Sequence, residues 1–311
     1  MSISLFIYQF HFSFNYDIFV TMINNLGVLL AGGTGTRLFP LTRILNKHLL
    51  PIYDKPMIYY SLSILLMSKI KDIVIVCNQE SLEKFQLLLN DGSEFGVNIS
   101  YSVQEEPEGI PHAIYTATKN FDYKQLLTVL GDNFVYGREF YKNILDKAKN
   151  KNTTTIFTQN VKNPEDFGIV ELDPISNKVI NLHEKPKTFV SSKAVIGIYY
   201  FDSQFNQLFE LQKKSLRGEY EIIDIIKSYG LENIDSYDIG RGTAWFDMGS
   251  FDDYFNTSLF VKTIQDRQGT FVNSPHEIAF RNKFIGKEEI EKFIYSNKNS
   301  EYAHGLEYLI S

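Results

Sequence analysis

The sequence predicts an α/β protein with a Rossmann-like, mixed but mostly parallel sheet flanked by helices and joined to a strand-rich lobe. First, apolar runs typical of buried strands alternate with helically spaced segments through the first 150 residues. Second, short strand-like runs with Asn-Pro and Asp-Pro turns replace this alternation afterwards. Third, 44% of the 311 residues are hydrophobic, which is enough for a sizeable core.

The first half of the chain supplies the alternating pattern. It predicts buried strands at residues 26–31, 72–77, 97–103 and 126–130, and helices at 59–68, 81–89 and 113–120. The first strand runs into three glycines at 32–35, and the last stops at Gly131-Asp132. This spacing favours right-handed crossovers, parallel strands, and ligands at the carboxyl ends of those strands.

The second half is expected to be richer in strands. Strand-like runs occupy residues 153–159, 168–172, 178–182 and 195–201, and helices are predicted at 221–229, 252–268 and 287–296. No low-complexity linker and no internal repeat separates the halves. We therefore expect one continuous domain made of a half at 22–150 and a half at 151–311.

Residues 1–21 do not fit this pattern. They contain five Phe and no Lys or Arg, and they have neither the basic start nor the continuous apolar centre of a secretory signal. Their alternation would suit an additional edge strand. We interpret Met22 as the true initiator and residues 1–21 as an extension.

Charge and cysteine content exclude several classes of protein. The formal net charge is −6, which gives no electrostatic reason to expect a nucleic acid or an anionic membrane surface as partner. No apolar stretch approaches the length of a membrane span. The single cysteine, Cys77, cannot form an internal disulfide and suits a reducing cytoplasm.

The strongest local signal is the glycine loop after the first strand, with the sequence GGTGTRL at 32–38. Glycines allow backbone N–H groups to converge on phosphate, although a tight turn has the same composition. The loop lacks the Gly-Lys-Ser/Thr of a P-loop and the third spaced glycine of a dinucleotide fold. Arg37 and Lys47 follow it and provide the two cations that a triphosphate requires.

The loop, together with KHLLPIYDKPMIYY at 47–60, resembles the signature of sugar-1-phosphate nucleotidylyltransferases, and within them the thymidylyltransferase branch. The resemblance runs from about residue 25 to 290. It implies a nucleotide-diphospho-sugar transferase fold, with nucleotide bound by the half at 22–150 and sugar phosphate by the half at 151–311. The implied reaction is Mg²⁺-assisted attack of glucose 1-phosphate on the α-phosphorus of dTTP, which gives dTDP-glucose and pyrophosphate for polysaccharide synthesis.

The resemblance also implies roles for particular residues. Arg37, Lys47, Asp132, Lys185 and Asp247 would form the catalytic set, with Asp132 and Asp247 as the metal ligands. The nucleotide would be bound by Leu30, Gly32, Gly33, Gly35, Thr36, Arg37, Lys47, His48, Gln104 and Gly109, of which Gln104 and Gly109 would read the pyrimidine edge. The sugar would be bound by Gly168, Glu184, Lys185, Val195, Tyr199, Glu219 and Trp245.

Five positions depart from that family pattern. His48 and His112 stand where the relatives have Gln, and Ile196, Ile223 and Met248 stand where they have Thr. Losing a hydroxyl near the sugar removes a hydrogen bond worth about 1 kcal/mol. This suggests the hypothesis that the sugar is a deoxy, amino or acylated relative of glucose. We expect the two histidines to replace amide hydrogen bonds rather than to bind metal.

Other interpretations remain open at this stage. UTP could replace dTTP, because thymine and uracil present the same edge. A non-catalytic nucleotide-sugar sensor is a third class, but it would not need the complete phosphate and metal set. Residues 274–281 resemble the family's carboxyl-terminal assembly segment, which implies a homo-oligomer, specifically a tetramer.

Overall fold

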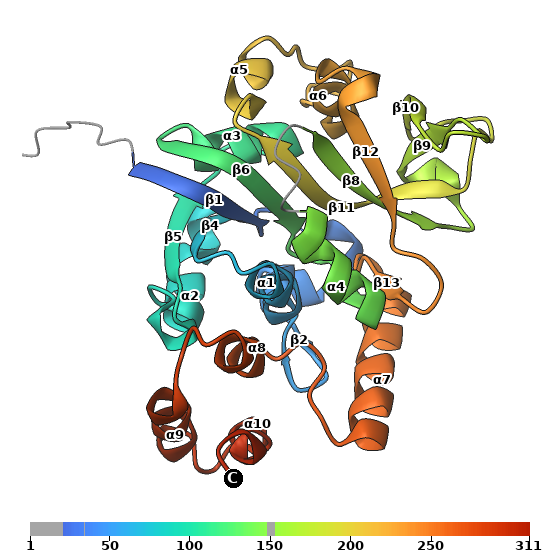
Figure 1. The fold of residues 1–311 in the computed structure, drawn as a ribbon. Coiled ribbons are helices and arrows are strands. Elements are labelled where there is room, and N and C mark those ends of the chain that lie inside the picture. The colour runs from blue at the N-terminus through green and yellow to red at the C-terminus, as the bar shows by residue number, and fades with distance from the viewer. Residues whose placement is uncertain (1–20, 34, 148–152) are drawn as a thin grey trace, which may run out of the picture.

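The computed structural model describes residues 21–33, 35–147 and 153–311. Within this part of the chain, nine strands form one mixed sheet, with the order β10-β9-β11-β6-β1-β4-β5 and with β8 and β12 joined beside β11 (Figure 1). The proposed extension at 1–21 lies outside the described residues except for Thr21. The predicted α/β class, with a mostly parallel core sheet flanked by helices, is confirmed.

The parallel part of the sheet comes from the first half of the chain. It consists of β1 (Thr21–Leu30), β4 (Asp72–Cys77), β5 (Asn98–Val103) and β6 (Phe121–Leu130). Leu30 is opposite both Val76 and Leu130. The carboxyl ends of β1, β4 and β6 therefore meet at one edge, where parallel strands of this kind bind ligands.

Antiparallel strands extend the sheet beyond β6. The strand β11 (Lys193–Asp202) pairs with β6 and with β8 (Thr154–Asn160). The remaining strands are β9 (Gly168–Leu172), β10 (Val179–Glu184) and β12 (Ile234–Asp238). The pairing of β11 with β6 makes one continuous sheet from the strands of both halves.

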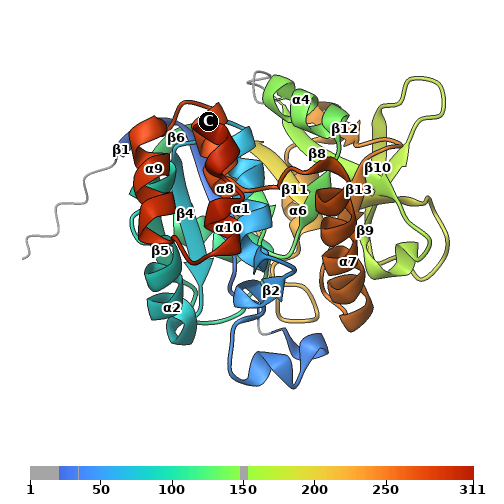
Figure 2. The ribbon, with the colours of Figure 1, turned by 90° about the horizontal axis from the view of Figure 1, so that it is seen from below.

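Helices cover both faces of the sheet (Figures 1 and 2). The cluster on one face draws on α1 (Met57–Met67), α2 (Gln79–Leu89), α4 (Arg138–Lys147), α8 (Pro275–Arg281) and α9 (Lys287–Ser296). The cluster on the opposite face draws on α3 (Ile110–Thr118), α5 (Phe205–Glu210) and α6 (Ile222–Ser228). Outside these layers lie α7 (Phe251–Gln268) and the short α10 (Glu301–His304).

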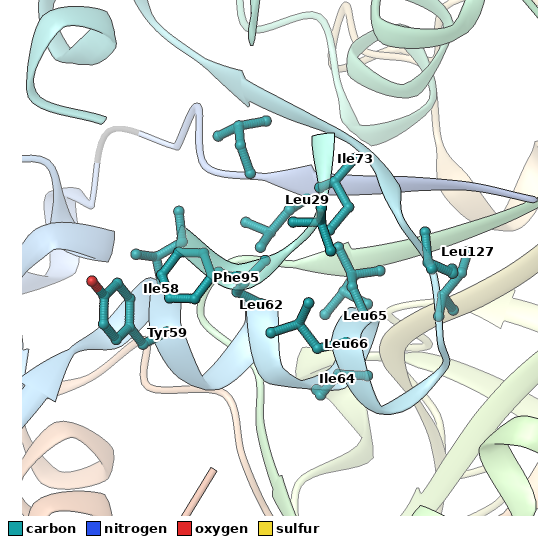
Figure 3. Close-up of a cluster of buried hydrophobic side chains, with 14 of the residues drawn as sticks. Leu29, Ile58, Tyr59, Leu62, Ile64, Leu65, Leu66, Ile73, Phe95 and Leu127 are labelled. Atoms are coloured by element: carbon teal, nitrogen blue, oxygen red, sulfur yellow. The ribbon is translucent and has the colours of Figure 1, made fainter. Parts of the chain in front are cut away.

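Helix α1 is apolar all round because it is enclosed on every side. Residues 57–66 are all buried, and Figure 3 shows Leu62 and Leu65 on the helix beside Leu29 of the central strand. Helix α8 packs against α1 on the side away from the sheet. A helix without a polar face is stable only in such a position.

Two small sheets complete the fold, and the sequence pattern did not predict them. The first pairs β7 (Phe134–Tyr136) with β13 (Ala244–Phe246), and the second pairs β2 (Pro51–Ile52) with β3 (Lys55–Pro56). The helices α4, α5 and α8 and the strand β12 were not predicted either. Helix α3 begins at Ile110 rather than at 113, because Gly109 caps it at a φ of 103° and Pro111 lies in its first turn.

None of the helices in the described ranges combines the length and apolar character needed to cross a membrane.

Candidate active site

A cavity of about 280 Å³ lies at the edge where β1, β4 and β6 end. Its lining unites residues from the glycine loop, the 3₁₀ segment Lys47–Leu49, the turn after β6 and the start of α3. The lining residues are Leu30, Gly32, Gly33, Lys47, His48, Val76, Gln104, Pro107, Gly109, Ile110, Ala113, Leu130, Asp132 and Glu219. The structure thus brings together most of the predicted nucleotide-binding residues with one predicted metal ligand and one predicted sugar contact.

The glycine loop packs along the side chain of Lys47. A Cβ on Gly33 would lie 3.7 Å from Cε of Lys47. Gly35 has a φ of +64°, and a Cβ there would lie 2.8 Å from Cγ2 of Thr42 and 3.0 Å from Cβ of Lys47. Glycine is therefore required at 35 both for its backbone conformation and for the close approach of Lys47.

The ammonium group of Lys47 forms an ion pair with Oδ2 of Asp132 inside the cavity. Only 13% of the Lys47 side chain and 15% of the Asp132 side chain are exposed. Burial is the largest single influence on the pKa of Asp132 and raises it, but the charge of Lys47, its hydrogen bond and smaller neighbouring effects together hold this pKa below its usual range. Asp132 is therefore a carboxylate at neutral pH.

His48 is buried beside this pair, with 2% of its surface exposed. Its Nδ1 lies 2.7 Å from Oδ1 of Asn46, so Nδ1 carries the proton and donates it. Burial, and then the charge of Lys47, lower the pKa of His48 to about 3. The ring is neutral and hydrogen-bonded to an amide, as expected from the sequence for a histidine that replaces Gln.

The small β7–β13 sheet carries Asp247 to the same region. Trp245 is opposite Val135 and Phe246 is opposite Phe134, so Asp247 leaves β13 beside the turn that holds Asp132. Burial raises the pKa of Asp247, and the negative charge of Asp132 raises it further. The two carboxylates are therefore near enough to influence one another electrostatically.

This donor set fits Mg²⁺. The ion binds proteins through one or two carboxylates and completes its shell with phosphate oxygens and water. No group of three or more His, Cys, Asp or Glu side chains suited to a metal occurs in the part of the chain that the structure describes. A structural zinc or calcium cage is therefore absent from those residues, whereas a two-carboxylate magnesium site agrees with them.

Arg37 lies beside Gly249, two residues after Asp247. Its guanidinium Nη2 lies 2.6 Å from the position that a Cβ on Gly249 would occupy. Its positive charge lowers the pKa of Asp247, although less than burial and Asp132 raise it. Gly35, Thr36 and Arg37 are not among the cavity-lining residues, so the cavity does not include these three predicted contacts.

The predicted sugar contacts gather at the ends of β9, β10 and β11. Gly168 is opposite Glu184 in the sheet, and a Cβ on Gly168 would lie 2.8 Å from Cδ1 of Ile223. Burial raises the pKa of Tyr199, and the charges of Glu184 and Asp132 add to this effect. The Tyr199 hydroxyl is therefore within electrostatic range of both Glu184 and Asp132.

The other predicted sugar contacts are spread around this group. Val195 is buried on β11, and Lys185 follows Glu184 on the surface with a φ of 43°. Trp245 donates its Nε1 hydrogen to Oδ1 of Asn133 over 2.6 Å, and its ring packs edge-on against Phe167 with centroids 5.6 Å apart. Only Glu219 of the predicted sugar contacts lines the 280 Å³ cavity itself.

Three of the five departures from the family pattern are buried in core clusters. Ile196 is 1% exposed in the cluster under α1, Met248 is fully buried in the cluster with Ile52 and Met57, and Ile223 is 1% exposed in the cluster on the opposite face. Ile223 also packs beside Gly168, a predicted sugar contact. That these residues reshape a sugar pocket stays a prediction, and Ile223 is the position from which it is tested.

Residues 214–220, from the second half of the chain, lie beside the loop between Gln104 and Gly109, which is predicted to contact the base. The backbone N–H of Tyr220 donates to the carbonyl oxygen of Glu108 over 2.9 Å, and Lys214 forms an ion pair with Glu108. Nε2 of Gln104 donates to the carbonyl of Gly109 over 3.4 Å. His112 Nδ1 lies 3.2 Å from the same Gln104 nitrogen, and its Nε2 lies 3.7 Å from Oε2 of Glu108.

Sequence reasoning assigned no role to Arg217, although its neighbour Glu219 was predicted. The guanidinium of Arg217 binds Glu221 over 2.6 Å and Glu184 over 3.3 Å, which places a fixed positive charge beside the sugar-side carboxylate. A cation two residues before a predicted sugar contact was the available signal.

Comparison with known proteins agrees with this arrangement. A family model described as nucleotidyl transferase matches residues 26–264. Glucose-1-phosphate thymidylyltransferase from Mycolicibacterium smegmatis is 41% identical over 90% of this chain and 97% of its own length. The enzyme of the same name from Neisseria meningitidis is 38% identical over the same shares.

Solved structures give the same result. A structure from Bacillus anthracis, named as a candidate glucose-1-phosphate thymidylyltransferase in complex with sucrose, is 34% identical and superposes with a TM-score of 0.69 over 76% of this chain and 94% of that one. A UDP-glucose pyrophosphorylase complexed with UDP-glucose has a TM-score of 0.68 over 78% of this chain and 99% of its own at 21% identity, which supports the fold alone.

The fold and the site define a nucleotide-binding α/β enzyme that works on phosphates. The chain belongs to the nucleotidyl transferase family, and the resemblance stated from the sequence is confirmed.

Proposed function

We propose that this enzyme transfers a thymidylyl group from dTTP to glucose 1-phosphate, forming dTDP-glucose and releasing pyrophosphate. One observation carries the proposal: a single cavity is lined by the glycine loop, Lys47 and Asp132 together with Gln104 and Gly109. A pyrimidine nucleotide with a phosphate tail matches this combination of amide edges and cations. The relatives at 38–41% identity carry the name of the same reaction.

The displacement needs no protein nucleophile. An oxygen of the sugar phosphate attacks the α-phosphorus, and the bond from that phosphorus to the bridging oxygen of pyrophosphate breaks. The requirements are in-line positioning and neutralisation of charge. Lys47 would hold the triphosphate from inside the cavity, and Arg37 would meet the departing pyrophosphate.

On the sugar side, Glu184 would accept hydrogen bonds from sugar hydroxyls. Lys185 would steady the sugar phosphate, while Glu219 spans the sugar side and the nucleotide cavity. Asp132 and Asp247 would hold Mg²⁺, which supplies electrostatic stabilisation of the phosphate charge when it is bound. In the metal-free protein Lys47 neutralises Asp132 and keeps this carboxylate ionised.

A substrate panel tests the proposal. Pyrophosphate release is measured with dTTP and UTP, each crossed with glucose 1-phosphate, an amino sugar 1-phosphate and a deoxy sugar 1-phosphate. We expect the highest kcat/KM for dTTP with glucose 1-phosphate. Preference for UTP would show that the base is uracil rather than thymine. Preference for a modified sugar would support the Ile223 hypothesis. No turnover with any pair would refute the enzyme assignment.

Variants connect the activity to the site. Asp132→Asn and Asp247→Asn should each lower kcat by about 100-fold or more, as the loss of a charge-stabilising group does. Asp266→Asn is the control, because Asp266 forms an exposed ion pair on α7. If either metal-site variant keeps wild-type turnover, that carboxylate has no role in catalysis.

We also propose that the enzyme is a cytoplasmic homo-oligomer, specifically a tetramer. Residues 274–281, which prompted the assembly hypothesis, comprise the N-cap and the whole of α8, and this helix packs against α1. Phe251, Phe255 and Leu259 expose 47%, 66% and 51% of their surfaces along one side of α7, which would suit burial in an assembly. Light scattering on the purified protein gives the mass, and a monomer at working concentration would contradict the proposal.

A further inference from the structure

Asn133 follows the metal-side carboxylate Asp132 and is held on every side. It is 2% exposed. Its backbone N–H donates to the carbonyl of Leu130 over 3.1 Å, and its own carbonyl accepts a hydrogen bond of 2.9 Å from the hydroxyl of Ser61 on α1. The backbone at the Asp132 turn is therefore anchored both to the end of β6 and to the buried helix.

The side chain of Asn133 joins this turn to the strand that carries the second carboxylate. Its Oδ1 accepts the Nε1 hydrogen of Trp245 over 2.6 Å. Trp245 lies on β13 two residues before Asp247, and the pairing of Phe246 with Phe134 makes Asp247 and Asn133 the next pair along the ladder. The amide therefore connects the two carboxylate-bearing segments at the point where they approach one another.

The other end of the same amide contacts the sugar-side strand. Nδ2 of Asn133 donates to the carbonyl of Gly197 over 3.5 Å. Gly197 has a φ of +72°, and a Cβ there would lie only 2.6 Å from that nitrogen. The register of β11 against β8 shifts between Val195 and Tyr199, so β11 bulges where the amide enters.

We propose that Asn133 is a positioning residue that sets the spacing of Asp132 and Asp247 and fixes the metal site relative to the sugar-binding strand. The inference rests on the proposed function, because it takes these two carboxylates as the metal ligands. The amide is the only group among the described residues that hydrogen-bonds both Trp245 and Gly197 through its side chain. Its loss would free Trp245, and with it Asp247, to move relative to Asp132.

The physical reason is the repulsion between the two carboxylates. Without a cation they push one another apart, and this contributes to the raised pKa of Asp247. A two-stranded sheet of three residues per strand is weak by itself. A buried hydrogen bond across that sheet resists the separation and keeps the site preformed for the ion, as partners of metal ligands commonly do.

Mn²⁺ binding to the enzyme alone tests the proposal without relying on turnover. The probe is Mn²⁺ without nucleotide or sugar phosphate, followed by the loss of the free-ion electron paramagnetic resonance signal. Asn133→Ala should weaken Mn²⁺ binding about 10-fold. Trp245→Phe keeps an aromatic ring but removes the N–H donor, and it should weaken binding by a similar factor. The double variant should be no weaker than the weaker single variant.

Fluorescence supplies a second readout. Trp245 is the only tryptophan in the chain, so fluorescence excited at the long-wavelength edge of tryptophan absorption comes from this indole. Asn133→Ala should change that emission. The control is Asn282→Ala. Asn282 follows α8, and its side-chain Nδ2 donates a hydrogen bond of 2.8 Å to the carbonyl oxygen of Leu66 on α1. This variant should alter neither the emission nor Mn²⁺ binding.

The outcomes separate this inference from the proposed function. If Asp132→Asn leaves Mn²⁺ binding unchanged in the wild-type background, the metal assignment itself fails. If Asp132→Asn abolishes binding while Asn133→Ala and Trp245→Phe bind as tightly as the wild type, the positioning role is refuted. Additive losses in the double variant also refute it, because two independent packing defects would give that result.

Discussion

Lys47→Met should inactivate the enzyme and destabilise the metal-free protein, and Asp132→Asn should inactivate it at a smaller cost in stability. The two side chains form an ion pair with 13% and 15% exposure. Unit charges about 4 Å apart attract by about 4 kcal/mol at an effective dielectric constant of about 20. Removing Lys47 leaves a buried carboxylate facing Asp247, and breaking such a pair costs about 3 to 5 kcal/mol. Partial exposure favours the lower value, about 3 kcal/mol.

Urea unfolding in EDTA at neutral pH measures this cost for the wild type, both single variants and the double variant. Asp132→Asn should cost less than Lys47→Met, because it leaves the Lys47 ammonium unpaired but also relieves the repulsion on Asp247. Lys47→Met/Asp132→Asn should recover most of the stability that Lys47→Met loses, since no buried charge is left unpaired. Neither single variant nor the double variant should regain turnover, and kcat should fall about 100- to 1000-fold.

Lys262→Met is the matched control for this series. Lys262 pairs with Asp266, but the side chains are 52% and 51% exposed. Its loss should cost less than about 1 kcal/mol and leave activity unchanged. Equal unfolding free energies for Lys47→Met and the wild type, or strictly additive effects in the cycle, would refute the claim that this pair is desolvated.

Three further predictions follow from single contacts. Gly131→Ala should lower thermal stability by about 1 to 3 kcal/mol in calorimetry, because its Cβ would lie 2.7 Å from the carbonyl of Leu30 and 2.7 Å from the His48 ring; an unchanged melting temperature contradicts this. The pKa of His48 is about 3 in the folded protein, against 6.5 for an unperturbed histidine. As the pH falls, the unfolded chain therefore binds a proton before the folded protein does. The free energy of unfolding should fall by about 2 kcal/mol from neutral pH to pH 5 because of this difference. His48→Gln should remove that part of the acid loss in urea titrations at both pH values. Ile223→Thr restores a hydroxyl beside Gly168 and should lower KM for glucose 1-phosphate about 5-fold, equivalent to one hydrogen bond; a KM equal to or above that of the wild type would show that the hydroxyl does not reach the sugar.

Much of the fold followed from periodicity. The expected strands at 26–31, 72–77 and 126–130 correspond to β1, β4 and β6, and the long helix expected at 252–268 is α7 at Phe251–Gln268. The elements that pattern did not indicate are short or lie on the periphery. Strands of three residues such as β7 and β13 are too brief to show alternation, and they form only because they pair with each other.

The candidate site shows the same division. The glycine loop, Arg37 and Lys47 follow one another closely, so their cooperation could be predicted locally. Asn133 could not be recognised, because its role depends on Trp245 and Gly197, which come from two other strands. The burial of Ile196 and Met248 in core clusters could not be predicted either, because sequence cannot tell whether an apolar side chain faces a pocket or the core.

The parallel strands, the glycine loop and the family could be recognised from the chain alone, since these depend on residues close together in sequence. That Asp132 and Asp247 come near enough to interact electrostatically, with more than a hundred residues between them, is known only from the folded structure. It also decided which side chains face the cavity and which the core. The reason is physical: repulsion, burial and hydrogen bonding act over a few ångströms of space, and chain distance does not reveal which groups come that close.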